Sequence, residues 1–262
     1  MKYAINPVDG TKIAYRTKGA GPAVVLVHGT ALSRVIWRGF GYVKDLSADH
    51  TVITLDLRGH GRSGKPQDQA SYSTRLMAGD VIAVLDDLGI SSAHYVGYSL
   101  GGRVGFSLAT THQDRLKSFV SMGGAPRNLP GAFDRLFFPN CIDALENDGM
   151  QGFVEKWEAH IGQPLDPATR AAFLANDSGA LAAYARSADQ NPGVATEALS
   201  AIEVPTLLVV GERDNERLDS AQTASRVIPN AELRILEGAG HGNTLIHPEA
   251  LPVVREFITK RS

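Results

Sequence analysis

The chain has 262 residues, 43% of them hydrophobic, and its 26 Lys and Arg nearly balance 28 Asp and Glu, for a formal net charge of −2. This length and apolar content are sufficient for one large hydrophobic core. The charge balance argues against nucleic acid and against an anionic membrane surface as partners, because both demand a basic surplus.

Short β-branched runs bounded by Gly, Pro or polar residues predict strands at 12–15, 23–27 and 51–55. Between residues 72 and 89, apolar residues recur at spacings of three and four, and Gly89 supplies a left-handed stop, which predicts an amphipathic helix. The elements expected next are a strand at 93–97, a helix at 100–111 and a strand at 116–120. Strands that alternate with helices imply a mostly parallel sheet.

After Pro126 this alternation stops, and residues 127–199 carry only helical patterns and turn residues. We therefore expect an inserted helical cap, with residues 1–126 and 200–262 forming the core. The cap contains two apolar groups, Met150, Phe153, Val154, Trp157 and Ile161 on one helical face, and Phe133, Leu136, Phe137 and Phe138 in a cluster. The alternation then resumes with strands at 206–210 and 232–236 and helices at 218–228 and 248–260. The predicted fold class is α/β, a mostly parallel central sheet flanked by helices and carrying the cap.

The segment Gly97-Tyr98-Ser99-Leu100-Gly101-Gly102 fits the Gly-x-Ser-x-Gly nucleophile elbow and lies between a predicted strand and a predicted helix, as that motif requires. In such an elbow the serine sits in a strained, sharp turn, and the glycines let strand and helix approach closely. We expect the Ser99 hydroxyl to be exposed at the start of the helix.

A serine hydroxyl is a weak nucleophile at neutral pH, so it needs a base, and the base needs an orienting acid. Downstream of Ser99, one predicted strand runs into Asp214 and the next into His241. Both lie beyond strand ends, where open α/β sheets place their sites. We predict a triad of Ser99, His241 as base and Asp214 as acid, with Glu212 as the main rival for the acid.

With these motifs the chain resembles the α/β-hydrolase superfamily over essentially its whole length. The family carries a His-Gly pair after its third strand, matched here by His28-Gly29-Thr30. The resemblance implies that the backbone N–H groups of Thr30 and Leu100 form the oxyanion hole, and we interpret His28 as shaping the loop. It also implies that the segment 56–63 shapes the core rather than performing chemistry.

Other cofactor chemistry is not indicated. Gly59-x-Gly61-x-x-Gly64 formally matches a dinucleotide fingerprint, and residues 59–65 nearly match a P-loop, but Lys65-Pro66 follows and prevents a helix from opening there. The histidines have no metal-binding spacing, and His247 is placed near the start of the last helix. We expect neither metal nor cofactor.

The substrate is less defined. Aromatic residues of the cap, with one beyond the oxyanion loop, suggest a mainly apolar pocket lined by Trp37, Phe133, Phe137, Phe138 and Trp157, although cap-to-core packing explains each of them equally well. Arg34 and Arg103 are interpreted as surface residues, so no anion clamp is expected.

The leading hypothesis is hydrolysis of a carboxylic ester or lactone of a small to medium apolar molecule. Within the resemblance, the alternatives are a carbon–carbon bond hydrolase of ring-cleavage products, a cofactor-free perhydrolase and a triad-retaining ligand receptor. Ser99 at the nucleophile position argues against the Asp-dependent epoxide hydrolases and haloalkane dehalogenases. The single cysteine, Cys141, and the lack of a signal-peptide pattern predict a cytoplasmic location, with no membrane span and an undefined oligomeric state.

Overall fold

The computed structural model describes residues 1–262. Its strands are β1 (Lys2–Ile5), β2 (Lys12–Lys18), β3 (Ala23–Val27), β4 (Thr51–Leu55), β5 (Ala93–Tyr98), β6 (Leu116–Met122), β7 (Thr206–Gly211) and β8 (Ala231–Leu236). Its helices are α1 (Val35–Gly39), α2 (Tyr42–Leu46), α3 (Thr74–Asp87), α4 (Leu100–Thr111), α5 (Ala132–Leu136), α6 (Cys141–Asn147), α7 (Gly149–Ile161), α8 (Pro167–Leu174), α9 (Ser178–Gln190), α10 (Asn215–Val227) and α11 (Ala250–Thr259). Short 3-10 helices are η1 (Gln69–Tyr72), η2 (Gln113–Arg115), η3 (Thr196–Ala201) and η4 (His241–Asn243).

All eight strands join one sheet in the order β1-β2-β4-β3-β5-β6-β7-β8. The strands from β4 to β8 in this order run parallel, whereas β1 and β2 pair antiparallel at one edge. The α/β prediction with a mostly parallel sheet is therefore confirmed. The sequence patterns did not indicate β1, because in this edge strand only Ala4 is buried and a period-2 apolar signal is lacking.

Side chains alternate between the two faces of the parallel strands, and each face has its own apolar layer. Val25 and Val27 of β3 pack in the cluster that contains residues of α3, α4 and α10, while Val24 and Leu26 pack in the cluster with α1, α2 and α11. The short helices α1 and α2, which the sequence patterns did not predict, are held on that second face by Trp37 and Tyr42. The central sheet is thus covered on both sides, as a parallel sheet requires.

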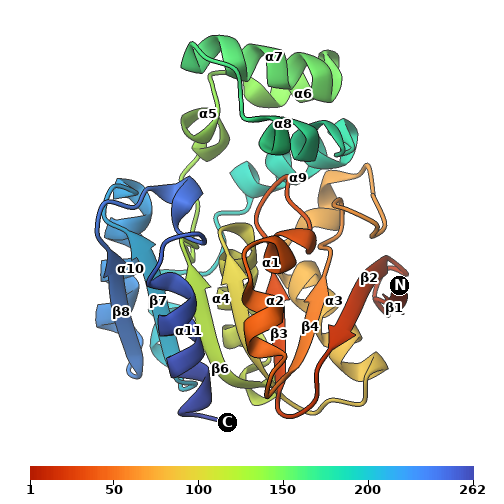
Figure 1. Ribbon diagram of the computed structural model, residues 1–262. Helices are drawn as coiled ribbons and strands as arrows, with labels where there is room; N and C mark the ends of the chain where they lie inside the picture. Colours follow the sequence, from red (N-terminus) through yellow and green to blue (C-terminus); the bar gives the residue numbers. More distant parts are fainter.

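The helices α5 to α9 are inserted between β6 and β7 and lie together above the carboxyl ends of the parallel strands (Figure 1). Phe137, Phe153, Trp157 and Phe173 contact one another within this insertion at ring-centroid distances of 4.9 to 6.3 Å. Ile161, which the helical face predicted to be inside, is 40% exposed at the end of α7. The extent of the cap, residues 127–199, stays a prediction.

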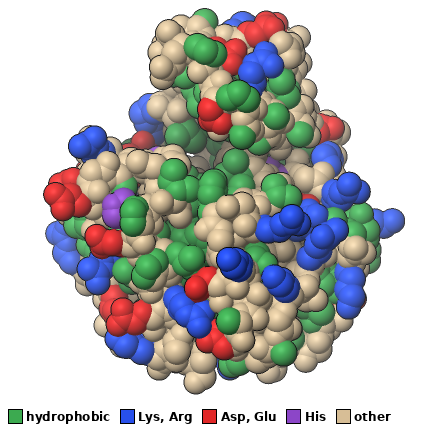
Figure 2. Space-filling model, viewed as in Figure 1, with side chains coloured by type: hydrophobic (Ala, Val, Ile, Leu, Met, Phe, Trp, Pro, Cys, Tyr) green, Lys and Arg blue, Asp and Glu red, His purple; other side chains and the backbone are tan.

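On the surface, hydrophobic side chains gather where the molecule narrows between this insertion and the sheet domain (Figure 2). None of the helices is both long enough and apolar enough to cross a membrane. The narrowing lies at the carboxyl ends of the parallel strands (Figure 1). In open α/β sheets the loops at these strand ends form the ligand-binding crevice.

Candidate active site

The turn between β5 and α4 has the strained geometry of a nucleophile elbow. Ser99 adopts φ 51° and ψ −110°, a region that L-residues rarely occupy. The flanking glycines explain how the turn is accommodated. A Cβ at Gly97 would lie 2.3 Å from the carbonyl carbon of Gly101, and a Cβ at Gly101 would lie 2.2 Å from the carbonyl oxygen of Val27 on β3. Strand and helix can therefore meet only because both positions lack side chains.

The structure brings the three triad residues together from three strand ends. The Ser99 Oγ lies 2.9 Å from Nε2 of His241, and Nδ1 of the same ring lies 2.6 Å from Oδ2 of Asp214. Because an ionised carboxylate only accepts hydrogen bonds, this contact favours the tautomer that carries its proton on Nδ1, in which Nε2 is an acceptor facing the Ser99 hydroxyl. Asp214 follows β7, and His241 opens η4 beyond β8.

Glu212, the rival for the acid, points elsewhere. Its Oε2 accepts a hydrogen bond from the backbone N–H of Gly238 at 2.8 Å, which ties two loops together. Tyr98, which sequence reasoning did not single out, stacks on the His241 ring with 5.6 Å between centroids and donates its hydroxyl to the His241 carbonyl at 2.9 Å. This aromatic contact restrains the orientation of the imidazole.

Two backbone N–H groups flank the serine. Leu100 is the first residue of α4, so its N–H has no acceptor within the helix. The N–H of Thr30 also lacks a backbone acceptor, and the next residue, Ala31, has a φ of 58° that turns the chain after β3. Both residues line the same cavity as Ser99. They are the donors from which an oxyanion hole could be built.

The His28 loop and the segment 56–63 are structural in geometry. His28 is fully buried, its Nδ1 donates to the Gly29 carbonyl, its Nε2 accepts from the Leu57 N–H, and burial lowers its pKa. Buried Asp56 accepts hydrogen bonds from the backbone N–H groups of Arg34 and Arg62 at 2.8 and 3.0 Å. The helix that a dinucleotide fingerprint or a P-loop would open does not begin at Gly64, since the next helical turn, η1, begins only at Gln69.

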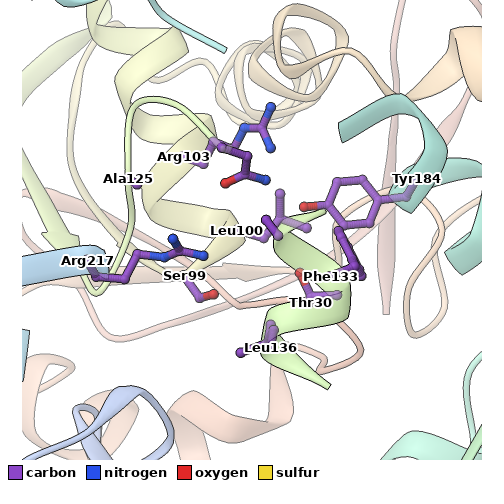
Figure 3. A pocket seen from close by; sticks show the side chains of 11 residues that line it. Thr30, Ser99, Leu100, Arg103, Ala125, Phe133, Leu136, Tyr184 and Arg217 are labelled. Carbon is purple, nitrogen blue, oxygen red and sulfur yellow. The ribbon is translucent and has the colours of Figure 1, made fainter. Parts of the chain in front are cut away.

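One cavity contains Ser99 (Figure 3). The cavity is narrow: its volume is about 30 Å³, well below that of sites that enclose a drug-sized molecule. The cavity lies under α5 and α9 and is lined by Thr30, Ser99, Leu100, Arg103, Ala125, Asn128, Ala132, Phe133, Leu136, Tyr184 and Arg217. Six of these eleven residues are hydrophobic, so the lining is mixed rather than mainly apolar.

Of the five aromatic residues predicted to line the pocket, the structure places only Phe133 there. Phe137, Phe138 and Trp157 pack inside the insertion, each against another aromatic ring at 5.1 Å between centroids. Trp37 is fully buried on the opposite face of the sheet, 5.1 Å from the Tyr42 ring. These four rings stabilise the layers in which they lie, because burying an aromatic side chain against other rings contributes favourable free energy of folding.

The two arginines interpreted as surface residues are also placed differently. Arg34 is 11% exposed at its side chain and forms an ion pair with buried Asp56 at 2.5 Å. Arg103 is 3% exposed and lines the cavity. The sequence could have indicated its position, because Arg103 follows Ser99 by four residues and therefore lies on the same side of α4, one turn from the nucleophile.

No three His, Cys, Asp or Glu side chains form a group that could hold a metal ion.

Comparison with known proteins agrees with this architecture. Residues 22–248 match the model of the alpha/beta hydrolase fold family. A provisionally assigned carbamate hydrolase, RutD, of Pseudomonas savastanoi is 31% identical over 252 residues, covering 90% of this chain and 92% of the relative. A provisionally assigned 2-succinyl-6-hydroxy-2,4-cyclohexadiene-1-carboxylate synthase of Bacillus subtilis is 27% identical and covers 96% of each chain.

Among solved structures, the esterase RhEst1 of a Rhodococcus species superimposes with a TM-score of 0.82 at 26% identity, covering 100% of this chain and 99% of that one. The match therefore extends over the inserted helices as well as the sheet. With the family model covering most of its residues, this chain belongs to the alpha/beta hydrolase fold family and is a hydrolase.

Proposed function

We propose that this protein is a serine hydrolase that cleaves a carboxylic ester or lactone of a small to medium substrate. The observation that carries the proposal is the continuous hydrogen-bonded set Ser99, His241 and Asp214, whose serine opens into the cavity beside the N–H groups of Thr30 and Leu100. Nucleophile, base, orienting acid and oxyanion donors are the four parts that acyl transfer needs.

The reaction follows from this geometry. His241 Nε2 accepts the Ser99 proton while Oγ attacks the substrate carbonyl, and the N–H groups of Thr30 and Leu100 donate to the oxyanion. His241 then gives its proton to the departing alkoxide, which leaves an acyl group on Ser99. A water molecule, deprotonated by His241, attacks this acyl group and releases the carboxylic acid with the free serine.

The relatives support an esterase-type hydrolase, but their names print different reactions: a carbamate hydrolase, an esterase and a synthase of a cyclohexadiene carboxylate. The substrate of this chain therefore has to be argued from its own cavity. The narrow cavity under α5 and α9, with a volume of about 30 Å³, favours a short acyl chain over a long one.

The test is the hydrolysis of 4-nitrophenyl esters graded from acetate to long acyl chains by wild type and Ser99→Ala. We expect turnover by wild type that peaks at a short chain and falls at least about 10³-fold in Ser99→Ala, because the nucleophile is removed. A suitable control is Ser107→Ala, because Ser107 lies on the same helix but outside the cavity lining.

Two results would contradict the proposal. One is a folded Ser99→Ala protein that keeps wild-type hydrolysis. The other is a wild type that is inactive on all esters and a lactone and cleaves only a vinylogous diketone acid, which would identify a carbon–carbon bond hydrolase instead.

A further inference from the structure

The side chain of Arg103 is buried without enough hydrogen-bond partners. Its Nη2 donates to the carbonyl of Asn191, but its Nε and Nη1 have no partner in the protein. The residue is 3% exposed and lines the cavity that contains Ser99. Buried donors that lack a partner are rare in folded proteins, and leaving part of a charged guanidinium unpaired is costly. A hydrogen-bond acceptor that enters the cavity with a ligand would pair with the free Nε and Nη1 donors of Arg103.

A second guanidinium, that of Arg217, lines the same cavity. Arg217 lies near the start of α10, three residues after Asp214, and its side chain is 13% exposed. In Figure 3 the Arg217 side chain extends toward Ser99, and the Arg103 side chain lies above Leu100. Both arginines belong to helices that begin at the carboxyl ends of parallel strands, so the fold itself directs them to the nucleophile.

The surrounding negative charges do not neutralise this pair. None of the eleven lining residues is Asp or Glu, and no carboxylate lies within 4 Å of a nitrogen of Arg103. Arg217 forms an ion pair with Glu216 at 3.0 Å, but Glu216 is shared with Arg135 at 3.3 Å. Asp189 is close enough to influence Arg103, yet it forms no hydrogen bond to it, and one of its own oxygens is unpartnered.

Burial lowers the pKa of Arg103, and the positive charge of Arg217 acts in the same direction. An anion placed between the two guanidinium groups would relieve both effects. The guanidinium fork matches the two oxygens of a carboxylate, and such charge-assisted hydrogen bonds are among the strongest that proteins form.

We propose that the substrate carries a free carboxylate in addition to its ester or lactone group, and that Arg103 and Arg217 bind this carboxylate beside Ser99. The inference rests on the proposed function and narrows it to anionic esters. In this proposal the two arginines determine substrate specificity, because they bind the carboxylate of the substrate and not its reacting carbonyl. An alternative role, in which Arg103 only joins α4 to the segment at Asn191, uses one of its donors and leaves the others unexplained.

The experiment compares substrates that differ only in the end of the acyl chain. Monoethyl succinate, glutarate and adipate each have a neutral counterpart of the same carbon number, namely ethyl butanoate, pentanoate and hexanoate. Acid release is followed by pH-stat. For at least one chain length we expect wild-type kcat/KM to be about tenfold or more higher for the anionic ester, because a site built around buried charges rejects an analogue that leaves them unpaired.

The variants Arg103→Gln and Arg217→Gln test whether this preference comes from the two arginines. Each should lower the ratio of kcat/KM for the anionic ester to kcat/KM for the neutral ester by at least about tenfold, because only the anionic ester uses the guanidinium charges. Arg226→Gln is the matched control, since Arg226 lies on the same helix α10, is exposed and is absent from the cavity.

Loss of fold in Arg103→Gln would leave Arg217→Gln as the test, together with calorimetric binding of glutarate to the Ser99→Ala protein. A purely structural arginine would lower both esters equally, and that result would overturn the inference, as would a wild type that prefers the neutral esters. Ser99-dependent turnover of neutral esters keeps the proposed function intact in those cases. Turnover of neither series, with glutarate still bound, would instead refute the hydrolase proposal and leave the anion site standing.

Discussion

The close approach of the backbone at Gly101, in α4, to the end of β3 gives a quantitative prediction for Gly101→Ala. A Cβ at position 101 would lie 2.2 Å from the Val27 carbonyl oxygen and 2.9 Å from that of His28, and both are backbone atoms that cannot rotate away. To restore even a 3.0 Å contact, the start of α4 must move away from the end of β3 by roughly 0.8 Å.

This displacement separates groups that must act together. Ser99 and the Leu100 N–H belong to the α4 side, whereas the Thr30 N–H belongs to the loop after β3. A misplacement near 1 Å costs about 10²-fold in rate, so we expect kcat/KM on a 4-nitrophenyl ester to fall about 100-fold. The free energy of unfolding should fall by only about 1 to 3 kcal/mol, since overpacking is partly offset by the better helix propensity of Ala.

Ester kinetics and urea denaturation on Gly101→Ala and Gly39→Ala provide the comparison. Gly39 ends α1 and adopts no positive φ, and a Cβ at this position would meet no atom within 4 Å, so the control should keep wild-type kinetics. A folded Gly101→Ala protein with unchanged kcat/KM would refute the view that this approach sets the distance between the two N–H donors.

Three further predictions follow from single contacts. Asp214→Asn should lower kcat on esters by about 10³- to 10⁴-fold with little loss of stability, because the His241 ring loses its orienting acid, whereas Glu212→Gln should stay within a few-fold in the same assay. Burial lowers the pKa of His60 from 6.5 to about 3. Between these two pH values the His60 side chain is therefore protonated in the unfolded chain and neutral in the folded one. Urea denaturation should show stability present above pH 6.5 and lost as pH falls, by up to about 1.4 kcal/mol per pH unit, with a shallower slope in His60→Asn. An equal slope in the variant would contradict that assignment. Phe137→Ala should cost about 3 to 5 kcal/mol of unfolding free energy, because Phe137 contacts four other rings inside the insertion; a cost below about 1 kcal/mol would show that these rings do not form a core.

The parallel sheet was predictable because its signals are local. The β-branched runs at β3, β4 and β7 and the helical spacing before Gly89 each reflect the burial of one segment, whatever surrounds it. The edge strand β1 was not predictable, since only one of its four residues is buried and its pairing with β2 supplies most of its order. The short helix α1 depends in the same way on Trp37, which is buried in the apolar layer that α1, α2 and α11 form on one face of the sheet.

The three residues of the hydrogen-bonded set were also predictable, because the elbow around Ser99 is a local motif and the order of the remaining two follows from the strand sequence. The sequence by itself could not distinguish Asp214 from Glu212 with certainty, since both follow β7 within four residues. Their side-chain directions differ, and only the packing of the loop at Gly238 decides which carboxylate reaches His241.

The lining of the cavity was decided by the tertiary structure alone. An aromatic residue on an amphipathic helix buries itself equally well against its own insertion or against a substrate, so the sequence could not tell Phe137 from Phe133. Arg103 shows the converse. A charged residue is ordinarily exposed, and only the covering of α4 by the insertion makes this one a buried, incompletely paired group next to Ser99. Local patterns determine which elements form, whereas the contents of the cavity between two layers depend on how residues distant in sequence come to face it.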